Sequence, residues 1–233
     1  HTFAANMKKI NIAIDGLSGC GKSSTAKAVA KALAYKFIDT GALYRAVTLY
    51  FLQNKVDLAH LEAVNNALSS IEIDFAYNPE SGKNETILNQ QNVEEEIRKM
   101  YVSEMVSPVA AIKAVRVAMV AQQQEMGKYR GVVMDGRDIG SVVFPDAELK
   151  LFMSASTEVR AERRRMELEA KGEKVNLQEI IDNLESRDLQ DSTRAESPLI
   201  KVEDAIEIDT SDMQFEDQVQ KVLDLAKEHI AAE

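Results

Sequence analysis

The sequence predicts an α/β fold: a five-stranded parallel sheet with helices on both faces, and a small antiparallel insert. Five short apolar runs, separated by helical stretches, each end at or near a polar residue. A glycine-rich loop follows the first run. At residues 71–101 the spacing of apolar and polar residues changes and interrupts the pattern of runs and helices. Short apolar runs that alternate with helices are typical of a parallel sheet covered on both faces. In such sheets, ligands bind at the carboxyl ends of the strands.

The first half of the sheet is predicted from residues 9–39. The run KINIAID at 9–15 places isoleucine at positions 10, 12 and 14, which is the period of a buried strand. Apolar residues then recur at helical spacing over 26–33, and a second apolar run at 35–38 stops at Asp39. Strand, loop, helix and strand in this order make a βαβ unit.

Three later runs complete the sheet, at 132–134, 149–153 and 205–208. After the last of them, apolar residues at helical spacing from Val219 to Ile230 predict a helix packed on the core. Residues 71–75 alternate between apolar and polar types, a turn follows at 78–82, and the apolar pattern resumes at 86–88. This segment is a predicted antiparallel hairpin. Residues 157–174 are dense in charge and predicted to be helical, a pattern typical of a solvated helix face.

Composition and charge exclude several classes of partner. The 233 residues include 28 Lys and Arg against 38 Asp and Glu, which gives a formal net charge of −10. Such a surface repels nucleic acid and anionic membranes, so we expect neither as a partner, and an anionic ligand needs a local basic pocket. The single cysteine excludes an internal disulfide, and no apolar run of about 20 residues offers a membrane span. We expect a cytoplasmic protein whose fold starts at Met7, with residues 1–6 as an artificial addition.

A phosphate-binding loop is the strongest motif. Residues 16–23, GLSGCGKS, match G-x-x-x-x-G-K-[ST] directly after a strand and before a helix, the context that this motif requires. Glycines let backbone N–H groups surround a phosphate, the lysine reaches the β and γ oxygens, and the serine can bind Mg²⁺. The predicted phosphate ligands are Gly16, Ser18, Gly19, Cys20, Gly21, Lys22, Ser23 and Ser24. For Cys20, packing beside the loop is favoured over a reactive thiol.

Three further stretches place cations and carboxylates near the same edge of the sheet. DTGALYR at 39–45 runs from a strand end into a helix, and Arg45 could reach a second phosphate. DGRDIG at 135–140 follows another strand, where Asp135 could order Mg²⁺ through water. Arg187, Asp191 and Arg194 share one helix face at i, i+4 and i+7, although a surface ion-pair ladder has the same spacing.

These motifs together resemble the bacterial cytidylate kinase family. The resemblance covers nearly the whole chain from Met7 and rests on IDGLSGCGKSS, DTGALYRA, SPVAAIKAVR at 107–116, DGRDIGSVVFPDA and RDLQDSTR. It implies the P-loop nucleoside-monophosphate kinase fold, with a core at 7–38, 102–155 and 175–233. It also implies a monophosphate-binding region at 39–101, whose insert is 71–101, and a mobile lid at 156–174. Leu17 and Thr40 depart from the family, which usually has proline and often has serine there.

The resemblance implies an enzyme that transfers the γ-phosphoryl group of ATP to CMP or dCMP, with Mg²⁺. Arg45, Arg137 and Arg194 would hold the acceptor phosphate. Cytosine would be read by Ser107, Arg116 and Asp138, and the ribose would be held by Asp191 with Arg187. Thr40 would also bind the acceptor. Ser23 would bind the metal directly, and Asp135 would bind it through water. The lid arginines would be drawn from positions 160, 163, 164 and 165. Of these, Arg160 would bind ATP. Arg164 would be catalytic, as would Lys22, Arg137 and Arg194.

The chemistry agrees with a phosphate acceptor. The three histidines, at 1, 60 and 229, lie outside every motif, and no general base is evident. A monophosphate has a second pKa of about 6, so it is largely deprotonated at neutral pH and needs no base. Cytosine offers an amino donor where uracil offers an acceptor, so a carboxylate at Asp138 would favour CMP over UMP. Nothing in the sequence indicates an obligate oligomer, and we expect a monomer.

Other classes of protein share single motifs with this chain. Residues 54–57 spell NKVD, the guanine-reading motif of GTPases, but they fall between two predicted helices instead of at a strand end. DTG at 39–41 and DTS at 209–211 imitate the aspartic protease pair, which needs an all-β scaffold. The nearest alternative is a kinase of the same fold that acts on another monophosphate or small metabolite.

Overall fold

The computed structural model describes residues 8–78, 80, 83–170 and 172–231, and it divides into two compact units. The core unit comprises the chain up to Ile38 and from Met126 onward, and the insert unit comprises Asp39–Glu125. The predicted addition at residues 1–6 lies outside the described residues. No described helix has the length and hydrophobicity needed to cross a membrane.

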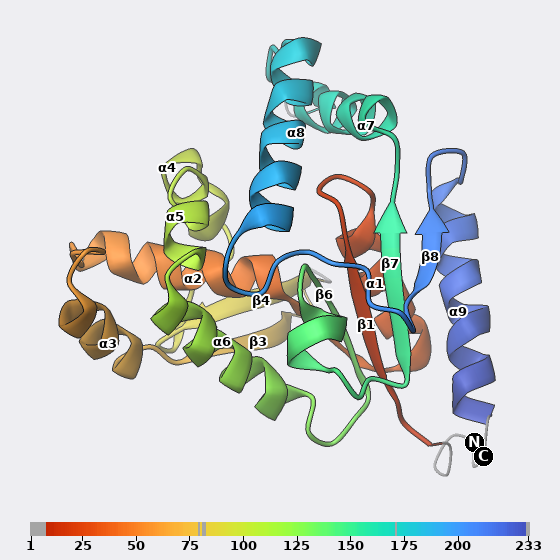
Figure 1. Ribbon diagram of the computed structural model, residues 1–233, viewed down its shortest axis with the longest axis horizontal. Helices are drawn as coiled ribbons and strands as arrows, with labels where there is room; N and C mark the ends of the chain where they lie inside the picture. Colours follow the sequence, from red (N-terminus) through yellow and green to blue (C-terminus); the bar gives the residue numbers. More distant parts are fainter. Residues whose placement is uncertain (1–7, 79, 81–82, 171, 232–233) are drawn as a thin grey trace. The chain divides into compact units, whose positions relative to one another are not determined.

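The core unit contains the predicted five-stranded parallel sheet, in the order β2-β6-β1-β7-β8 (Figure 1). The strands are β1 Asn11–Gly16, β2 Lys36–Asp39, β6 Val132–Gly136, β7 Leu149–Ser154 and β8 Ile206–Asp209. β1 is central, pairing with β6 on one side and β7 on the other. Each of these five strands was predicted from an apolar run, and the parallel sheet is confirmed.

Alternation along β1 sends its side chains to two different faces. Ile12 and Ile14 are fully buried in a cluster with residues of helix α1 (Lys22–Leu33) and helix α9 (Phe215–Ala231). That cluster includes Val222, Ala226 and Ile230, as the predicted last helix requires. On the opposite face, Asp15 contacts η3 (Ile139–Val143), a single π-helical turn.

Two helices extend the core unit beyond the carboxyl end of the sheet. They are α7 (Thr157–Ala170), which confirms the predicted charge-dense helix, and α8 (Leu177–Thr193). They pack through a small apolar cluster of Ala161, Ile180 and Leu184. α8 begins at Asn176, whose side chain accepts from the N–H of Gln178 and so caps the helix.

The insert unit contains helices and a three-stranded antiparallel sheet, ordered β3-β4-β5 (Figure 1). The strands are β3 Ile73–Asn78, β4 Lys83–Leu88 and β5 Gln91–Asn92; the helices are α2 Thr40–Gln53, α3 Leu61–Ser69, η2 Glu96–Arg98, α4 Met100–Ser103, α5 Val106–Ala110 and α6 Lys113–Met126. The predicted hairpin is confirmed, and β5 adds a short third strand. Residues 54–57 connect α2 to α3, so the NKVD motif lies in a helix connection, as predicted.

The boundary between the units differs from the predicted division. Residues 102–125 were expected in the core, but they belong to the insert unit. The reason is packing: α4 contacts α2 and η2, and α5 contacts α2, whereas the sequence pattern of a short helix does not show which helix it packs on. The predicted lid, 156–174, corresponds to α7 and the residues after it.

Candidate active site

The loop between β1 and α1 has the backbone of an anion-binding nest. Gly19 and Gly21 have φ values of 75° and 89°, in the left-handed region that side chains disfavour. Within the described part of the chain, the N–H groups of Gly19, Cys20 and Gly21 donate to no protein acceptor. Among the described side chains, none caps the N-terminus of α1. Consecutive unpaired N–H groups at a helix start attract phosphate.

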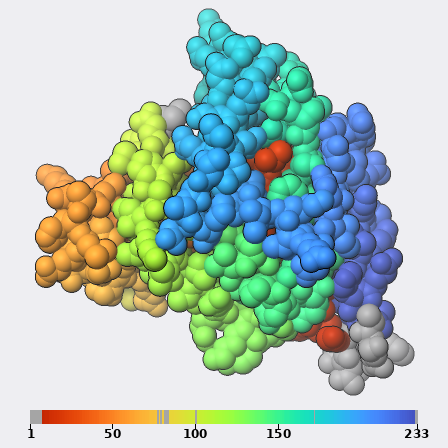
Figure 2. Space-filling model, in the orientation of Figure 1, coloured from red at the N-terminus to blue at the C-terminus, as the bar shows by residue number. Residues whose placement is uncertain are grey.

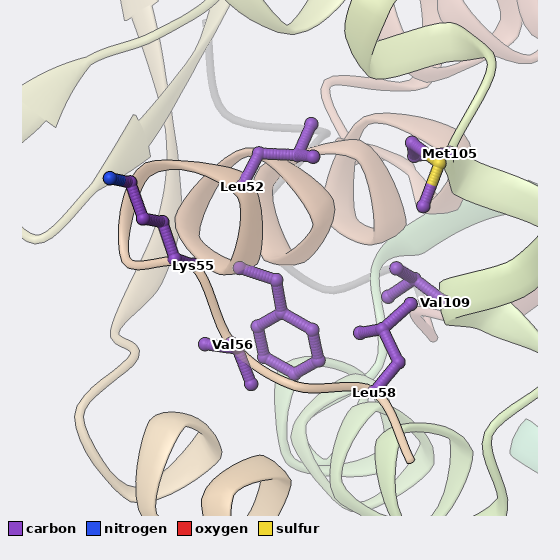
Figure 3. A pocket seen from close by; sticks show the side chains of 7 residues that line it. Leu52, Lys55, Val56, Leu58, Met105 and Val109 are labelled. Carbon is purple, nitrogen blue, oxygen red and sulfur yellow. The ribbon is translucent and has the colours of Figure 1, made fainter.

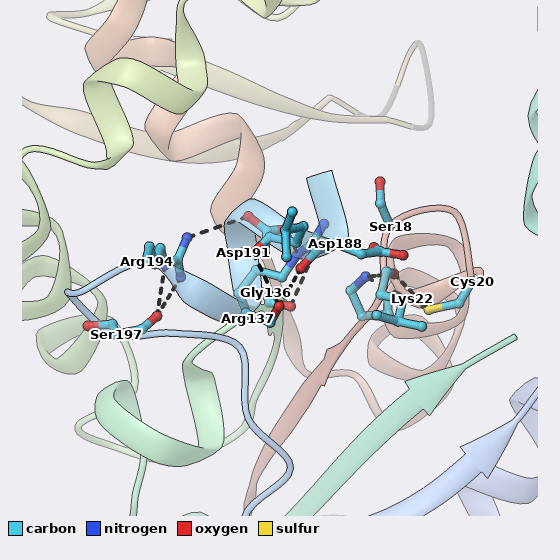
Figure 4. A network of polar contacts seen from close by, with 12 residues as sticks. Ser18, Cys20, Lys22, Gly136, Arg137, Asp188, Asp191, Arg194 and Ser197 are labelled. Atoms are coloured by element: carbon cyan, nitrogen blue, oxygen red, sulfur yellow. Dashed lines mark hydrogen bonds and ion pairs between the residues drawn. The ribbon is translucent and has the colours of Figure 1, made fainter. Parts of the chain in front are cut away.

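Lys22 lies at the inner side of this loop. Its side chain is only 5% exposed, and its Nζ donates to the carbonyl oxygen of Leu17 at 2.5 Å (Figure 4). Burial, followed by the positive charge of Arg137, lowers the pKa of Lys22. A bound anion would relieve both effects, because it supplies the opposite charge that the buried ammonium lacks.

Cys20 is buried, which agrees with the packing role. Its Sγ lies 3.0 Å from the carbonyl oxygen of Leu17 and 3.3 Å from that of Met153. It is the one cysteine in the chain and is free of any disulfide. Its place between two carbonyl groups ties the loop to the neighbouring strand β7.

Oxygen donors suited to magnesium meet at the start of α1. Ser23 Oγ donates to Asp135 Oδ2 at 2.7 Å, although 112 residues separate them. Ser23 and Ser24 are both exposed in the first turn of α1. Mg²⁺ prefers oxygen ligands and is bound by few protein groups together with nucleotide phosphates. Among the described residues, no group of three or more His, Cys, Asp and Glu side chains could hold a metal alone.

Asp191 positions two arginines. Arg137, just after β6, donates from Nε to Asp191 Oδ2 at 2.6 Å (Figure 4). Arg194, at the end of α8, lies with Nη1 3.7 Å from Asp191 Oδ1. Arg194 also donates to the carbonyl oxygen of Ser197 from Nε and Nη2, at 2.9 and 2.7 Å. Although burial opposes it, the ion pair with Asp191 raises the pKa of Arg137.

Arg187 lies on α8 one turn before Asp191. Its side chain reaches solvent, yet desolvation of its head group, followed by the charge of Arg137, lowers its pKa. Within the described residues it makes no hydrogen bond or ion pair. The core unit of this acidic chain therefore brings Lys22, Arg187 and Arg194 near Arg137 and its partner Asp191, and such a cluster of cations could attract an anionic ligand despite the net charge of −10.

Asp15, at the end of β1, holds the DGRDIG segment. Its Oδ1 accepts from the N–H of Ile139 at 2.8 Å, and its Oδ2 accepts from the N–H of Gly140 at 2.7 Å. Burial raises the pKa of Asp15 to about 6; the two N–H groups oppose this rise, and the charge of Asp138 adds to it. Asp138, which is 3% exposed, directly precedes the turn that Asp15 binds.

Replacing Asp15 should change how stability depends on pH. Because its pKa is raised on folding, its contribution to the free energy of unfolding is present below its unfolded pKa and is lost as pH rises through about 6. Asp15→Asn removes this titration. We expect the stability of the variant relative to wild type to improve by roughly 1 kcal/mol between pH 5 and pH 8. Urea unfolding at both pH values measures the difference; an identical difference at both would contradict the assignment.

The four arginines of α7 divide into two pairs. Arg160 is 3% exposed and contacts the phosphate loop, and Arg163 donates to Thr210. Arg164 is half exposed and pairs with Glu167 at 3.1 Å, and Arg165 pairs with Glu162 and Glu169. The arrangement agrees with the expectation that part of this charge-dense stretch faces solvent.

The remaining predicted ligands lie in the insert unit. Thr40 is buried in the first turn of α2, whose N-cap is Asp39. Arg45 donates from Nη1 to Ser103 Oγ at 2.5 Å. Arg116 is 4% exposed and lies over the ring of Tyr44, 5.0 Å from its centroid. Ser107 is exposed on α5, available to a ligand.

An apolar pocket of about 260 Å³ also lies in the insert unit (Figure 3). Figure 3 shows the ammonium group of Lys55 directed away from the pocket. The pocket lining is Phe51, Leu52, Lys55, Val56, Leu58, Met105 and Val109. A nucleotide site needs polar groups that orient its phosphates, so this pocket does not fit one.

Several partners of the site residues have no sequence signal. The carbonyl oxygens of Leu17, Ser18 and Ser197 accept from site cations, but a backbone carbonyl has no residue type that could reveal it. Asp15 and Asp188 were missed for a different reason. Their partners lie 124 and 28 residues away, and neither belongs to a recognisable spacing.

A family model described as cytidylate kinase matches residues 12–228. The chain belongs to the cytidylate kinase family. A cytidylate kinase of Cytophaga hutchinsonii is 56% identical over 220 residues, covering 94% of each chain. One from Bacteroides fragilis is 53% identical over 215 residues, covering 91% of this chain and 94% of the relative. One from Flavobacterium psychrophilum is 52% identical over 222 residues, covering 94% and 98%. The predicted resemblance to cytidylate kinases is confirmed, and the chain is an enzyme of that family.

Proposed function

We propose that this chain transfers the γ-phosphoryl group of ATP to CMP or dCMP, giving ADP and CDP or dCDP. One observation carries the proposal: a phosphate loop whose buried lysine has a lowered pKa beside Arg137, in a member of the cytidylate kinase family. Burial, together with the nearby positive charge of Arg137, lowers the pKa of both Lys22 and Arg187, and such a group of cations fits a site for charged phosphates.

The donor phosphates bind at the loop between β1 and α1. The unpaired N–H groups of Gly19, Cys20 and Gly21 surround them, and Lys22 neutralises the β and γ oxygens. The flanking Gly16, Ser18, Ser23 and Ser24 complete this loop. Because Lys22 is buried, its charge acts in a low-dielectric setting and stabilises the developing charge more strongly than it would in water.

Ser23 and Asp135 would hold Mg²⁺, Ser23 directly and Asp135 through water. Their oxygens are 2.7 Å apart, and the hard oxygen donors match this ion. When bound, the ion neutralises phosphate charge and orients the triphosphate.

The acceptor monophosphate supplies its own nucleophile. A phosphate with a second pKa of about 6 is largely deprotonated at neutral pH, so no base is required. The protein therefore positions the phosphate oxygen and neutralises its charge. We assign this role to Arg137 and Arg194, which Asp191 orients, and to Arg45.

Cytosine and ribose recognition follow from hydrogen-bond polarity. A carboxylate at Asp138 accepts from the amino group of cytosine and repels the carbonyl oxygen of uracil. Ser107 and Arg116 would complete the base contacts, Arg187 with Asp191 would hold the ribose, and Thr40 would line the acceptor site. The least exposed of these, Asp138 and Arg116, discriminate most strongly, because an unpaired buried polar group is costly.

The lid would be residues 156–174. Arg164 is its best candidate for a contact with the transferring phosphate, because its exposed pair with Glu167 is weak and easily exchanged. Arg160, expected among the ATP ligands, instead donates to Ser18, Asp188 and Ala155, so we do not assign it a direct contact with ATP. We expect the enzyme to act as a monomer in the cytoplasm.

The reaction is tested by measuring ADP release from MgATP with CMP, dCMP, UMP, AMP and GMP as separate acceptors. We expect CMP and dCMP to be the best acceptors, with UMP at least about 10-fold slower in kcat/KM. Equal rates with CMP and AMP would rule out the proposed substrate class. ADP release without any acceptor would indicate an ATPase instead.

A further inference from the structure

Two carbonyl groups of the phosphate loop accept hydrogen bonds from side chains outside the loop. The carbonyl oxygen of Ser18 accepts from Arg160 Nη1 at 3.1 Å. The carbonyl oxygen of Cys20 accepts from Thr210 Oγ1 at 3.0 Å. Both donors lie in the core unit, Arg160 on α7 and Thr210 just after β8. Figure 4 shows the turn that carries Ser18 and Cys20 above Lys22.

These bonds fix the direction of two N–H groups. The described peptide bonds are all trans, so a C=O group and the N–H of the next residue point in opposite directions within the same peptide plane. Binding the Ser18 carbonyl on one side therefore directs the Gly19 N–H to the other, and the Cys20 carbonyl does the same for Gly21. Both glycines rotate freely in the unfolded chain, so such anchors are needed to hold one orientation.

Arg160 is fully committed to protein acceptors. Besides Ser18, its guanidinium donates to Asp188 Oδ2 at 2.7 Å, to the Ala155 carbonyl at 3.0 Å and to Thr157 Oγ1 at 3.1 Å. Arg160 is only 3% exposed and its guanidinium has four protein acceptors. It is therefore better suited to hold the loop in place than to bind a phosphate. Its pair with Asp188 also ties the phosphate loop to α8, where the next residue toward the N-terminus is Arg187.

Thr210 is anchored in turn by Arg163. Arg163 donates to Thr210 Oγ1 at 3.0 Å and to its carbonyl oxygen at 2.6 Å. Thr210 Oγ1 is also within 3.1 Å of the Ser154 carbonyl at the end of β7. The loop is thus held from two elements, α7 and the residue after β8. Arg164 and Arg165 on the same helix instead donate to Glu167, Glu162 and Glu169.

We propose that Arg160 and Thr210 are positioning residues that hold the N–H groups of the phosphate loop in place for the triphosphate of ATP. The hydrogen bond of each to a loop carbonyl preorganises the nest, so that ATP binding does not have to order it. Arg160 acts through the backbone and does not contact the phosphates. This inference rests on the proposed function, which requires ATP phosphates at this loop.

The test is MgATP binding by titration calorimetry to wild type, Arg160→Lys, Arg160→Met and Thr210→Val. We expect each variant to bind MgATP about 5-fold to 10-fold more weakly, with the KM for CMP within about 2-fold of wild type. Lysine should not rescue Arg160, because its compact ammonium lacks the planar fork with which the guanidinium donates from three separate nitrogens. Lys27→Met is the matched control: it removes one positive charge from an exposed position on α1, has no assigned contact with ATP, and should bind like wild type.

Thermal unfolding of every variant separates positioning from simple destabilisation. A role in fold stability alone would lower the unfolding temperature and leave the affinity of the folded protein unchanged. That result, or a wild-type affinity in Thr210→Val, would overturn the inference. Full rescue by Arg160→Lys would show a direct phosphate contact and would also overturn it. Failure of the wild-type protein to bind MgATP would instead refute the proposed function.

Discussion

Lys22→Met is expected to lower kcat with CMP by about 100-fold or more, while the protein stays folded. Lys22 is a buried cation that contacts the phosphate loop, and its loss would leave the β and γ oxygens without that counter-charge. Methionine fills a similar volume and removes a buried charge whose pKa burial already lowers, so the fold should not be destabilised. The rate of ADP release and the unfolding temperature are the two measurements.

Lys27→Met provides the matched control for this prediction. Lys27 lies on α1, five residues after Lys22, and its side chain is exposed. The same substitution there should leave kcat unchanged. A Lys22→Met enzyme with kcat within threefold of the Lys27→Met enzyme would remove Lys22 from the catalytic machinery.

Asp138→Asn is expected to reduce the preference for CMP over UMP by roughly 10-fold to 100-fold in kcat/KM. The amide keeps the shape of the carboxylate but offers both a donor and an acceptor, so it can meet uracil as well as cytosine. Because Asp138 is 3% exposed, water cannot readily substitute for a lost bond.

The KM for MgATP serves as the internal control for this variant. It should stay within about 2-fold of wild type, because the change removes only a base contact. Asp138→Ala should lose the preference by a similar factor. If the CMP to UMP ratio is unchanged in both variants, Asp138 does not read the base.

The central sheet could be predicted from sequence because each strand has its own apolar pattern and its own stop signal. Ile10, Ile12 and Ile14 identify β1, and the glycine-rich loop follows at once. The phosphate loop could also be predicted from the sequence, since its chemistry depends on residue types at fixed spacing. The insert hairpin was recognisable for the same reason: its alternation differs from that of the buried strands.

The tertiary contacts of individual side chains could not be predicted from the sequence in the same way. Arg160 and Arg164 are four residues apart in one charged helix, and nothing in their spacing shows that one is buried against Ser18 and the other exposed. Whether residues 102–125 belong to the core depends on which helix they pack against. Asp15 reads as the last residue of a strand, and only the fold reveals that it binds a turn 124 residues away.

The transfer reaction is tested most directly by a competition experiment with γ-labelled ATP, Mg²⁺ and equal concentrations of CMP, UMP, AMP and GMP. Separation of the products shows which acceptor receives the label. We predict that most of the label appears in CDP, with UDP a minor product, and that Lys22→Met forms CDP at least about 100-fold more slowly. Label mainly in another nucleoside diphosphate, or only in inorganic phosphate, would contradict the assignment of this chain as an ATP-dependent kinase of CMP.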